Sequence, residues 1–239
     1  MEINQTERDK KYNFWARKQP VYISLVVPFV LILIYYNDNQ NMLSDVKYVV
    51  SLLLSLTSVV TSLFFFLSFF IRDMAKYIPE KLLWCIWGIP TTELLCDEIH
   101  IFTDQRKIDI RKKIKDSLVI DLESISNKSE NSKEYTKRVD EAVRRIKEKT
   151  RENPILFEYE CIYGFYRNMS AAFLLDNLFI ILPMYIYNIC YPNILPYGNR
   201  NLIFVGGVLL VFMILCIILT YINGVRYAKR LYVSFLSLD

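Results

Sequence analysis

The sequence predicts an all-α membrane protein, with four transmembrane helices in two hairpins and a helical cytoplasmic insertion between the hairpins. Three observations lead to this fold class. The 239 residues are 53% hydrophobic, with a mean hydropathy of +0.22, which is too apolar for a typical soluble domain. Charged residues still make up 23% of the chain, and they are crowded into a few segments. Between those segments lie four long runs that hold almost no charge.

Each of the four runs approaches or reaches the roughly 20 residues that an α-helix needs to cross a hydrocarbon core of about 30 Å. Because lipid offers no partner to an unpaired backbone group, a helix is the structure expected for each run. The first run has only 16 residues, and Asp176 is the one charged residue in all four. The predicted spans are Val21–Tyr36, Tyr48–Ile71, Ala171–Cys190 and Leu202–Ile222.

Basic residues set the predicted orientation. Five Lys and Arg residues precede the first span and three follow the last, whereas the short connection within each hairpin holds one. Since basic residues stay on the cytoplasmic side, both termini are predicted to be cytoplasmic in a multi-pass protein of the cell inner membrane. The predicted parts are a tail (residues 1–20), a first hairpin (21–71), a cytoplasmic helical domain (72–170), a second hairpin (171–222) and a C-terminal tail (223–239).

The predicted cytoplasmic domain holds 19 of the 29 basic residues and 18 of the 25 acids. Apolar residues recur there at helical spacing in two stretches, which predicts two amphipathic helices that pair with each other or across subunits. Pro154 is expected to mark the end of the second helix. The periodic residues are Ile110, Ile114, Leu118 and Leu122 in the first stretch and Tyr135, Val139, Ala142, Val143 and Ile146 in the second.

Four serines in the second predicted span share one helical face, because they lie at i, i+4, i+7 and i+11. Hydroxyl groups in such a row can border water in a pore, and small hydroxylated residues also form close-packing surfaces between spans. Both interpretations are open at this point. The candidate pore-lining serines are Ser51, Ser55, Ser58 and Ser62.

Asp176 is the strongest single-residue candidate, because an acid inside a span is costly unless it faces a partner or a water-filled cavity. One interpretation is a ring of carboxylates at the cytoplasmic mouth of an oligomeric pore, where the ring favours cations. The other is an acid at the membrane interface, paired with Arg72 or Arg167.

A cluster of cations in the predicted cytoplasmic helices could receive a phosphorylated ligand, because Lys and Arg bind phosphate as point charges and forks. Acids are interleaved with these cations, so a solvated helix surface explains them as well, and anionic lipid headgroups are a further use of the same charge. The candidate ligand-binding residues are Arg106, Lys107, Arg111, Lys112, Lys113, Arg144 and Arg145.

Enzyme chemistry has little support in the sequence. It contains no Walker loop, no G-x-G-x-x-G and no G-x-S-x-G motif. Its five cysteines form no C-x-x-C pair, and His100 is the one histidine. We therefore expect no catalytic residue, no metal site and no cofactor.

The arrangement of two hairpins around a charged insertion resembles a family of small membrane effectors of bacterial antiphage systems, the Hailong type. The resemblance covers the whole chain in outline and depends on two short motifs, Pro90-Thr91-Thr92 and Tyr163-Gly164-Phe165-Tyr166-Arg167-Asn168. It implies a tetrameric membrane channel whose opening depolarises the infected cell. It also implies control by an oligonucleotide that a partner nucleotidyltransferase makes.

Together these features predict a homo-oligomeric, regulated ion channel in the lipid bilayer. A nucleotide or oligonucleotide would act on its cytoplasmic helices. The alternative is a non-conducting membrane adaptor, in which residues 72–170 recruit a cytoplasmic partner and the spans only anchor them.

Overall fold

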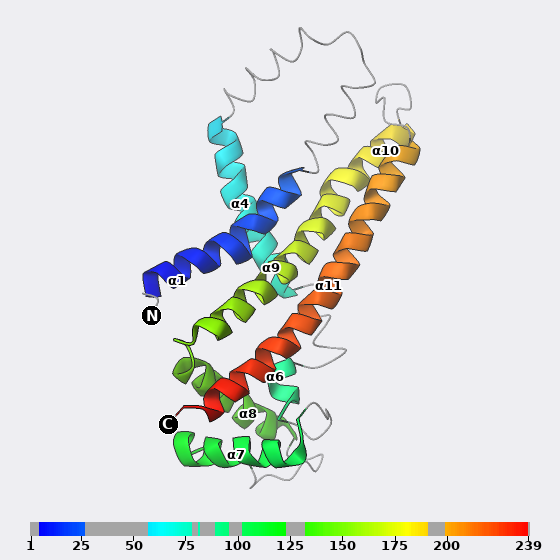
Figure 1. The fold of residues 1–239 in the computed structure, drawn as a ribbon. Helices are drawn as coiled ribbons and strands as arrows, with labels where there is room; N and C mark the ends of the chain where they lie inside the picture. Colours follow the sequence, from blue (N-terminus) through cyan, green and yellow to red (C-terminus); the bar gives the residue numbers. More distant parts are fainter. Residues whose placement is uncertain are drawn as a thin grey trace. The chain divides into compact units, whose positions relative to one another are not determined.

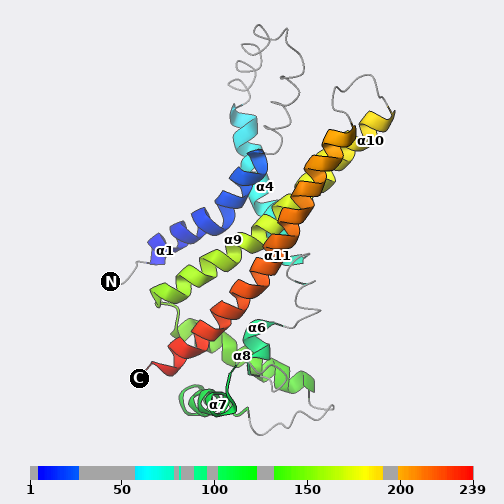
Figure 2. The ribbon, with the colours of Figure 1, turned by 45° about the vertical axis from the view of Figure 1, so that its right-hand side comes forward.

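The structure is a computed structural model that describes residues 5–26, 57–77, 81, 89–95, 102–122, 132–190 and 199–238. Within these residues every regular element is a helix and no strand occurs, so the predicted all-α class is confirmed for them. Figures 1 and 2 show the helices from two directions. The elements are α1 (Gln5–Tyr12), the π-helical η1 (Asn13–Lys18), α4 (Thr57–Ala75), α6 (Pro90–Glu93), α7 (Asp104–Leu118), α8 (Ser132–Lys149), α9 (Pro154–Asp176), the π-helical η3 (Asn177–Ile181), α10 (Leu182–Cys190) and α11 (Asn199–Leu236).

Two helical stretches are long and apolar enough to cross a membrane, as judged by length and composition. One runs for 37 residues from Pro154 to Cys190, and the other for 35 residues from Leu202 to Leu236. They contain the predicted third and fourth spans. The first two predicted spans lie partly outside the described residues, since residues 27–56 are not among them. The number of spans and their hairpin arrangement therefore stay predictions.

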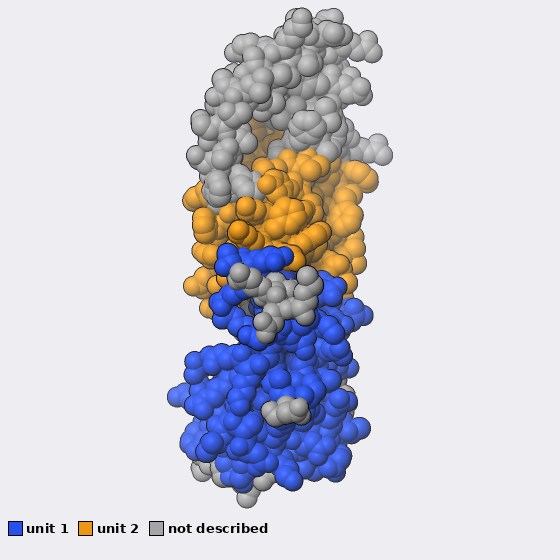
Figure 3. Space-filling model, turned by 60° about the vertical axis from the view of Figure 1, so that its left-hand side comes forward, with its two compact units in different colours: residues 1–8, 82–163, 220–239 blue, residues 9–81, 164–219 orange. Residues whose placement is uncertain are grey.

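The chain divides into two compact units, which Figure 3 distinguishes by colour. Unit 1 comprises Met1–Arg8, Leu82–Tyr163 and Thr220–Asp239. Unit 2 comprises Asp9–Lys81 and Gly164–Leu219. The helices α9 and α11 each contribute residues to both units.

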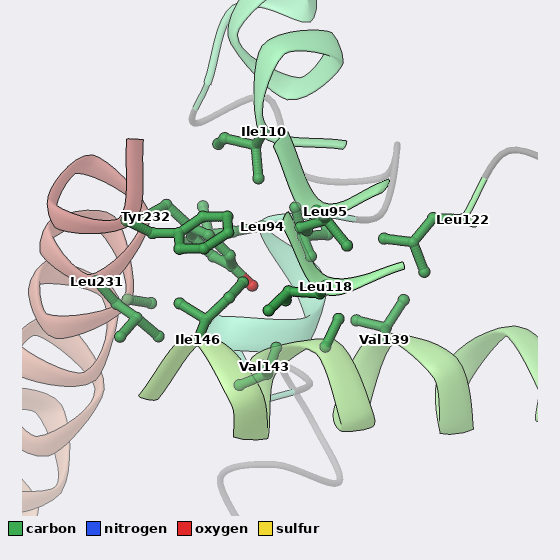
Figure 4. Close-up of a cluster of buried hydrophobic side chains, with 14 of the residues drawn as sticks. Leu94, Leu95, Ile110, Leu118, Leu122, Val139, Val143, Ile146, Leu231 and Tyr232 are labelled. Atoms are coloured by element: carbon green, nitrogen blue, oxygen red, sulfur yellow. The ribbon is translucent and has the colours of Figure 1, made fainter. Parts of the chain in front are cut away.

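The hydrophobic core of unit 1 is formed by α6, α7, α8 and the C-terminal part of α11 (Figure 4). The predicted periodic residues of both amphipathic helices are buried in it, from Ile110 to Leu122 and from Tyr135 to Ile146. Leu231, Tyr232 and other residues of α11 close the core. Helical periodicity therefore identified the buried face of α8 and that of α7 as far as Leu118, because residues three and four apart share one side of a helix. Leu122 is buried too, but it was wrongly placed on this helix, because α7 ends at Leu118 and Val119 turns the chain into the left-handed conformation.

Helix ends in unit 1 follow from local side chains. Asn153 caps α9, since its Oδ1 accepts hydrogen bonds from the backbone N–H of Ile155 (3.0 Å) and of Leu156 (3.3 Å). Pro154 is the first residue of α9, where its missing N–H would have no helical partner anyway. The proline expected to mark the end of the preceding helix thus begins the next one, five residues after α8 ends at Lys149.

The first motif of the sequence, Pro90-Thr91-Thr92, anchors α6 within unit 1. The Thr92 hydroxyl donates to Asp140 Oδ1 of α8 at 3.0 Å, and the Tyr232 hydroxyl of α11 donates to the carbonyl of Thr91. Both threonines are buried. The motif therefore joins three helices of unit 1.

In unit 2, residues 9–26 form one continuous helix, here called the N-terminal helix, which runs parallel to α9 and contacts it at a constant offset. Asn168 Nδ2 donates to the carbonyl of Ala16 at 2.6 Å, and the Ser24 hydroxyl donates to Asp176 Oδ1 at 2.7 Å. Both bonds join residues 152 positions apart, so the two helices keep register over two turns, or about 12 Å. Gly164 makes the close approach feasible, because a Cβ built there would lie 3.0 Å from both Ala16 Cβ and the Tyr12 hydroxyl.

A hydrophobic cluster in unit 2 packs α9 and η3 against α11. Its buried residues are Met169, Phe173, Ile181, Leu202, Leu209 and Cys216. Gly206 lies at this contact, where an added Cβ would come within 3.0 Å of Ile181 Cγ2 and 3.3 Å of Asn177 Oδ1. Gly207 has nothing within 4 Å of the same position. The two neighbouring glycines thus lie in different surroundings.

We expect Gly164→Val to destabilise unit 2, because the added side chain would push against the Ala16 methyl group. Overpacking of this kind costs about 1–3 kcal/mol. The matched control is Gly207→Val, which makes the same change where nothing lies within 4 Å. Thermal unfolding of the purified protein in detergent compares the two variants. Equal midpoints would contradict the tight contact.

Val119 ends α7 in the left-handed conformation, with φ of 58° and a side chain that is 90% exposed. A branched residue is strained there by about 1–2 kcal/mol, and glycine is not. Val119→Gly should therefore raise the free energy of unfolding by roughly 0.5–1 kcal/mol, after allowance for the flexibility of glycine in the unfolded chain. Val119→Ala keeps the strain and serves as the control. Denaturation of both variants should show a gain for glycine alone.

Candidate functional site

Asp176 lies at the last position of α9, where η3 begins, and its side chain is only 3% exposed. An apolar cluster of unit 2 includes the residue before it, Leu175. Ala172 and Leu175 of α9 pack there with Val21 of the N-terminal helix and Ile71 of α4. The acid that the sequence singled out is therefore buried next to a contact between three segments of unit 2.

Among the described residues, one side chain donates a hydrogen bond to this carboxylate. The Ser24 hydroxyl, itself only 7% exposed, donates to Oδ1 at 2.7 Å. The other oxygen, Oδ2, is buried and accepts no hydrogen bond from the part of the chain that the structure describes. A buried carboxylate is costly when its oxygens lack donors. Asp176 thus retains the capacity to accept one further donor or a cation.

Neither Arg72 nor Arg167, the two predicted partners, forms an ion pair with Asp176 in the described part of the chain. Arg72 Nε instead pairs with Asp73 Oδ1 at 3.1 Å. Asn177, the neighbour of Asp176, donates its amide to the carbonyl of Phe173 at 2.9 Å. Ser24, which belongs to the first predicted span, was not expected as the partner.

Two of the four candidate pore-lining serines belong to the described residues. Ser51 and Ser55 lie outside the described residues. Ser58 and Ser62 lie in α4, although their side chains are not described. The hydroxyl face of the second span therefore stays a prediction.

Several predicted ligand-binding cations instead hold helix ends in unit 1. Arg111 Nη2 donates to the carbonyl of Leu95 at 2.7 Å, next to α6. Lys113 Nζ donates to the carbonyl of Leu236 at 3.0 Å, at the end of α11, and also contacts that of Leu238. The last carbonyls of a helix lack backbone partners and carry partial negative charge, so cations suit them.

Arg144 and Arg145 meet at Glu141 on α8. Arg144 Nη2 and Arg145 Nε lie 2.9 Å and 2.8 Å from Glu141 Oε1. The two hydrogen bonds lower the pKa of Glu141 from 4.5 to about 2, and the bond from Arg144 has the larger effect. The same pair raises the pKa of Arg144. Arg145 Nη1 also donates to the carbonyl of Leu118, at the end of α7, at 3.3 Å.

The remaining three candidates are separated along α7. Lys107 is buried, Arg106 lies over the ring of Phe102 at 5.5 Å, and Lys112 is exposed. The described contacts of these cations are thus mostly with helix ends and one acidic side chain, and their role as a ligand site stays a prediction. Periodicity gave no signal for this, because the carbonyl partners are backbone atoms of other helices.

A basic cleft in unit 2 was missed by the sequence analysis. It has a volume of about 460 Å³ and lies between η1, with the end of α1, and the last turns of α4. Four cations line it, namely Lys10, Arg17, Lys18 and Arg72. The available signal was the basic stretch before the first span together with the arginine at the end of the second, but nothing local shows that they meet.

No group of three or more His, Cys, Asp or Glu side chains converges within the described segments in a way that could hold a metal ion. Comparisons with protein-family models, curated proteins and solved structures find no match to this chain.

The lowered pKa of Glu141 predicts an acid-dependent loss of stability in α8. A carboxyl group with a depressed pKa in the folded state stabilises fully above its unfolded value of 4.5, and this contribution is lost as the pH falls toward about 2. Glu141→Gln removes the contribution at every pH. The stability difference between the natural protein and this variant should therefore shrink as the pH is lowered through that range.

Glu148→Gln is the matched control, because Glu148 also contacts Arg144, at the longer distance of 3.4 Å. Thermal midpoints measured from pH 7 to pH 3 should show a smaller and flatter difference for this variant. An identical pH dependence of both variants would contradict the special position of Glu141.

Proposed function

We propose that the chain is a subunit of a regulated, homo-oligomeric ion channel, a pore-forming effector of antiphage defence in the cell inner membrane. Its four spans form two hairpins with both termini in the cytoplasm. The observation that carries the proposal is Asp176, a buried carboxylate in an apolar helix with one oxygen that has no donor among the described residues. An ionisable side chain inside a span is costly, and those that occur typically face the bundle interior or line an ion or proton pathway.

The exposure of α11 supports placement in a bilayer within an oligomer. Only 22% of its most apolar stretch is buried inside the chain. Large apolar side chains such as Ile203, Phe204 and Val211 are more than half exposed. A continuous apolar surface of this length requires lipid or further subunits to cover it. The core helix of a soluble protein would be mostly buried.

The parallel course of the N-terminal helix and α9 supports the proposed topology. Spans that both begin on the cytoplasmic side, as the first and third do in the proposal, must run in the same direction. The constant offset of 152 between Ala16 and Asn168 and between Ser24 and Asp176 meets that requirement. The N-terminal helix leads directly into the first proposed span.

Conduction through Asp176 would require a rearrangement, because its carboxylate points into the chain and bonds to Ser24. We therefore assign the observed contact to the closed state, in which the first span covers the acid. In the open state the first span moves away and the carboxylates of several subunits form a ring. A regulator acts by binding the two states unequally.

The proposed regulator is a nucleotide or oligonucleotide made by a partner nucleotidyltransferase. Unit 1 is the proposed cytoplasmic receiver of this signal. Arg106 and Lys112 of α7 are the candidates that are exposed and form no ion pair with any described residue. The other five cations bind backbone carbonyls or Glu141, or are buried. A ligand that recruited them would have to break those contacts, so they do not form a ready-made phosphate site.

Asp176→Asn tests the central residue. We expect potassium efflux from liposomes that contain the purified full-length protein to fall by roughly tenfold, because the neutral amide no longer attracts cations. Ser24→Ala should act in the opposite direction and raise basal efflux, since it removes the hydrogen bond assigned to the closed state. Protein-free liposomes give the background.

Asp116→Asn is the matched control, because it removes an exposed acid of α7 that belongs to unit 1 and has no role in the proposed path. Ser55→Leu combined with Ser58→Leu adds a test of the hydroxyl face and should block efflux without preventing insertion. If Asp176→Asn and Asp116→Asn gave the same potassium efflux, the proposed role of Asp176 in the ion path would be wrong.

A second function, a non-conducting membrane adaptor, is favoured by the closed core of unit 1. Helices α6, α7 and α8 pack with the end of α11 as one body that could present a surface to a soluble partner. No efflux under any condition, together with co-purification of a defined partner with the full-length protein, would favour this function.

A further inference from the structure

The basic cleft of unit 2 is built by two helices that are distant in sequence. Lys10, Phe14, Arg17 and Lys18 all line the cleft, so they share one side of the N-terminal helix. Phe69 and Arg72 come from the last turns of α4. The opposite side of the N-terminal helix, at Ala16, is buried against α9. The basic side of the N-terminal helix therefore faces α4 across the cleft.

The positive charge of the cleft is only partly compensated. Arg17 Nη1 donates to the neutral amide oxygen of Asn13 at 2.6 Å. Arg72 pairs with Asp73, which is exposed and does not line the cleft. Lys10 and Lys18 are exposed and form no ion pair with any residue that the structure describes. Four cations therefore surround about 460 Å³ with no lining acid.

Aromatic rings give the cleft an apolar wall. Phe14 is 43% exposed and Phe69 is 56% exposed. The Arg72 guanidinium lies 5.2 Å from the centre of the Phe69 ring, and Phe14 stacks edge-to-face on the exposed Trp15 at 5.5 Å. Exposed aromatic rings beside cations are typical of the headgroup depth of a bilayer. A ligand that carries both phosphate and hydrocarbon matches this lining better than a fully polar ion does.

We propose that this cleft binds the phosphate of an anionic phospholipid headgroup, with the acyl chains leaving along Phe14 and Phe69. The Arg17 and Arg72 guanidinium groups supply planar donors for phosphate oxygens, and the lysine ammonium groups supply point charges. The bound lipid ties the N-terminal helix to α4. The site requires contact with a membrane and stands whether or not the protein conducts ions.

The test uses the full-length protein, purified in detergent and stripped of lipid. Dioleoylphosphatidylglycerol and dioleoylphosphatidylcholine are titrated separately, and native mass spectrometry counts the bound molecules. We expect a preference of about tenfold or more for phosphatidylglycerol. Lys10→Gln combined with Lys18→Gln should remove most of that preference, because each basic residue near an anionic headgroup contributes roughly fivefold to binding.

The matched control is Lys76→Gln combined with Lys81→Gln. It makes the same change in net charge at two exposed lysines that do not line the cleft. This variant should bind phosphatidylglycerol as the natural protein does. Asn13→Asp is a second cleft variant of almost unchanged shape, and it should weaken binding by neutralising Arg17. Thermal midpoints without lipid show that each variant is folded.

Glycerol phosphate, added as a competitor, separates a lipid from a soluble source of phosphate. Competition by glycerol phosphate that disappears in the lysine variant would support recognition of the headgroup phosphate in the cleft. Binding of glycerol phosphate without any preference for phosphatidylglycerol over phosphatidylcholine would assign the cleft to a soluble ligand and overturn the lipid site. Equal losses in the cleft and control variants would show that surface charge alone attracts the lipid, and this would overturn the site. No preference for phosphatidylglycerol would overturn it as well. Ion efflux is not the readout, so a non-conducting protein leaves the result intact.

Discussion

The close parallel contact between the N-terminal helix and α9 is the constraint on which the rest of unit 2 depends. Gly164 lets the two backbones approach, and Asn168 fixes their register through the carbonyl of Ala16. Two turns further along, the same register brings Ser24 to Asp176. Because one side of the N-terminal helix is used in this way, its basic side is left to face α4 and line the cleft. One packing contact therefore positions both the buried acid and the cations.

Two π-helical segments lie at these functional positions. Asn13, Phe14, Arg17 and Lys18 of η1 line the cleft, and η3 begins directly after Asp176. A π-turn takes an additional residue, so it rotates the side chains that follow relative to those before it. Pro183, just after η3, has no N–H for the helical ladder, and a wider turn before it accommodates that loss. Each π-helical segment therefore changes which side chains before and after it lie on the same face of the helix.

Local patterns predicted the local features and failed where distant segments meet. The buried sides of α7 and α8 followed from apolar spacing, and Asp176 stood out because a charge in an apolar run is costly. Its partner Ser24 lies 152 positions away, so no spacing rule could name it. The cleft lies between α4 and the π-helical η1. Spacing rules for a regular α-helix do not show which side chains of a π-helix share a face. Cations of α7 and α8 bind backbone carbonyls, which leave no mark in the pattern of side chains.

The different use of basic residues in the two units follows from where acceptors are available. In unit 1, helix ends supply carbonyl groups, and Arg111, Lys113, Arg145 and Lys149 all donate to them. Those charges stabilise helix termini and leave little for an external anion. In unit 2 the cations of the cleft lie beside helix sides, where every backbone carbonyl already has its helical partner. Basic residues placed along a helix side near the proposed membrane surface therefore retain their charge for a ligand, and phosphate is the anion that a bilayer supplies there.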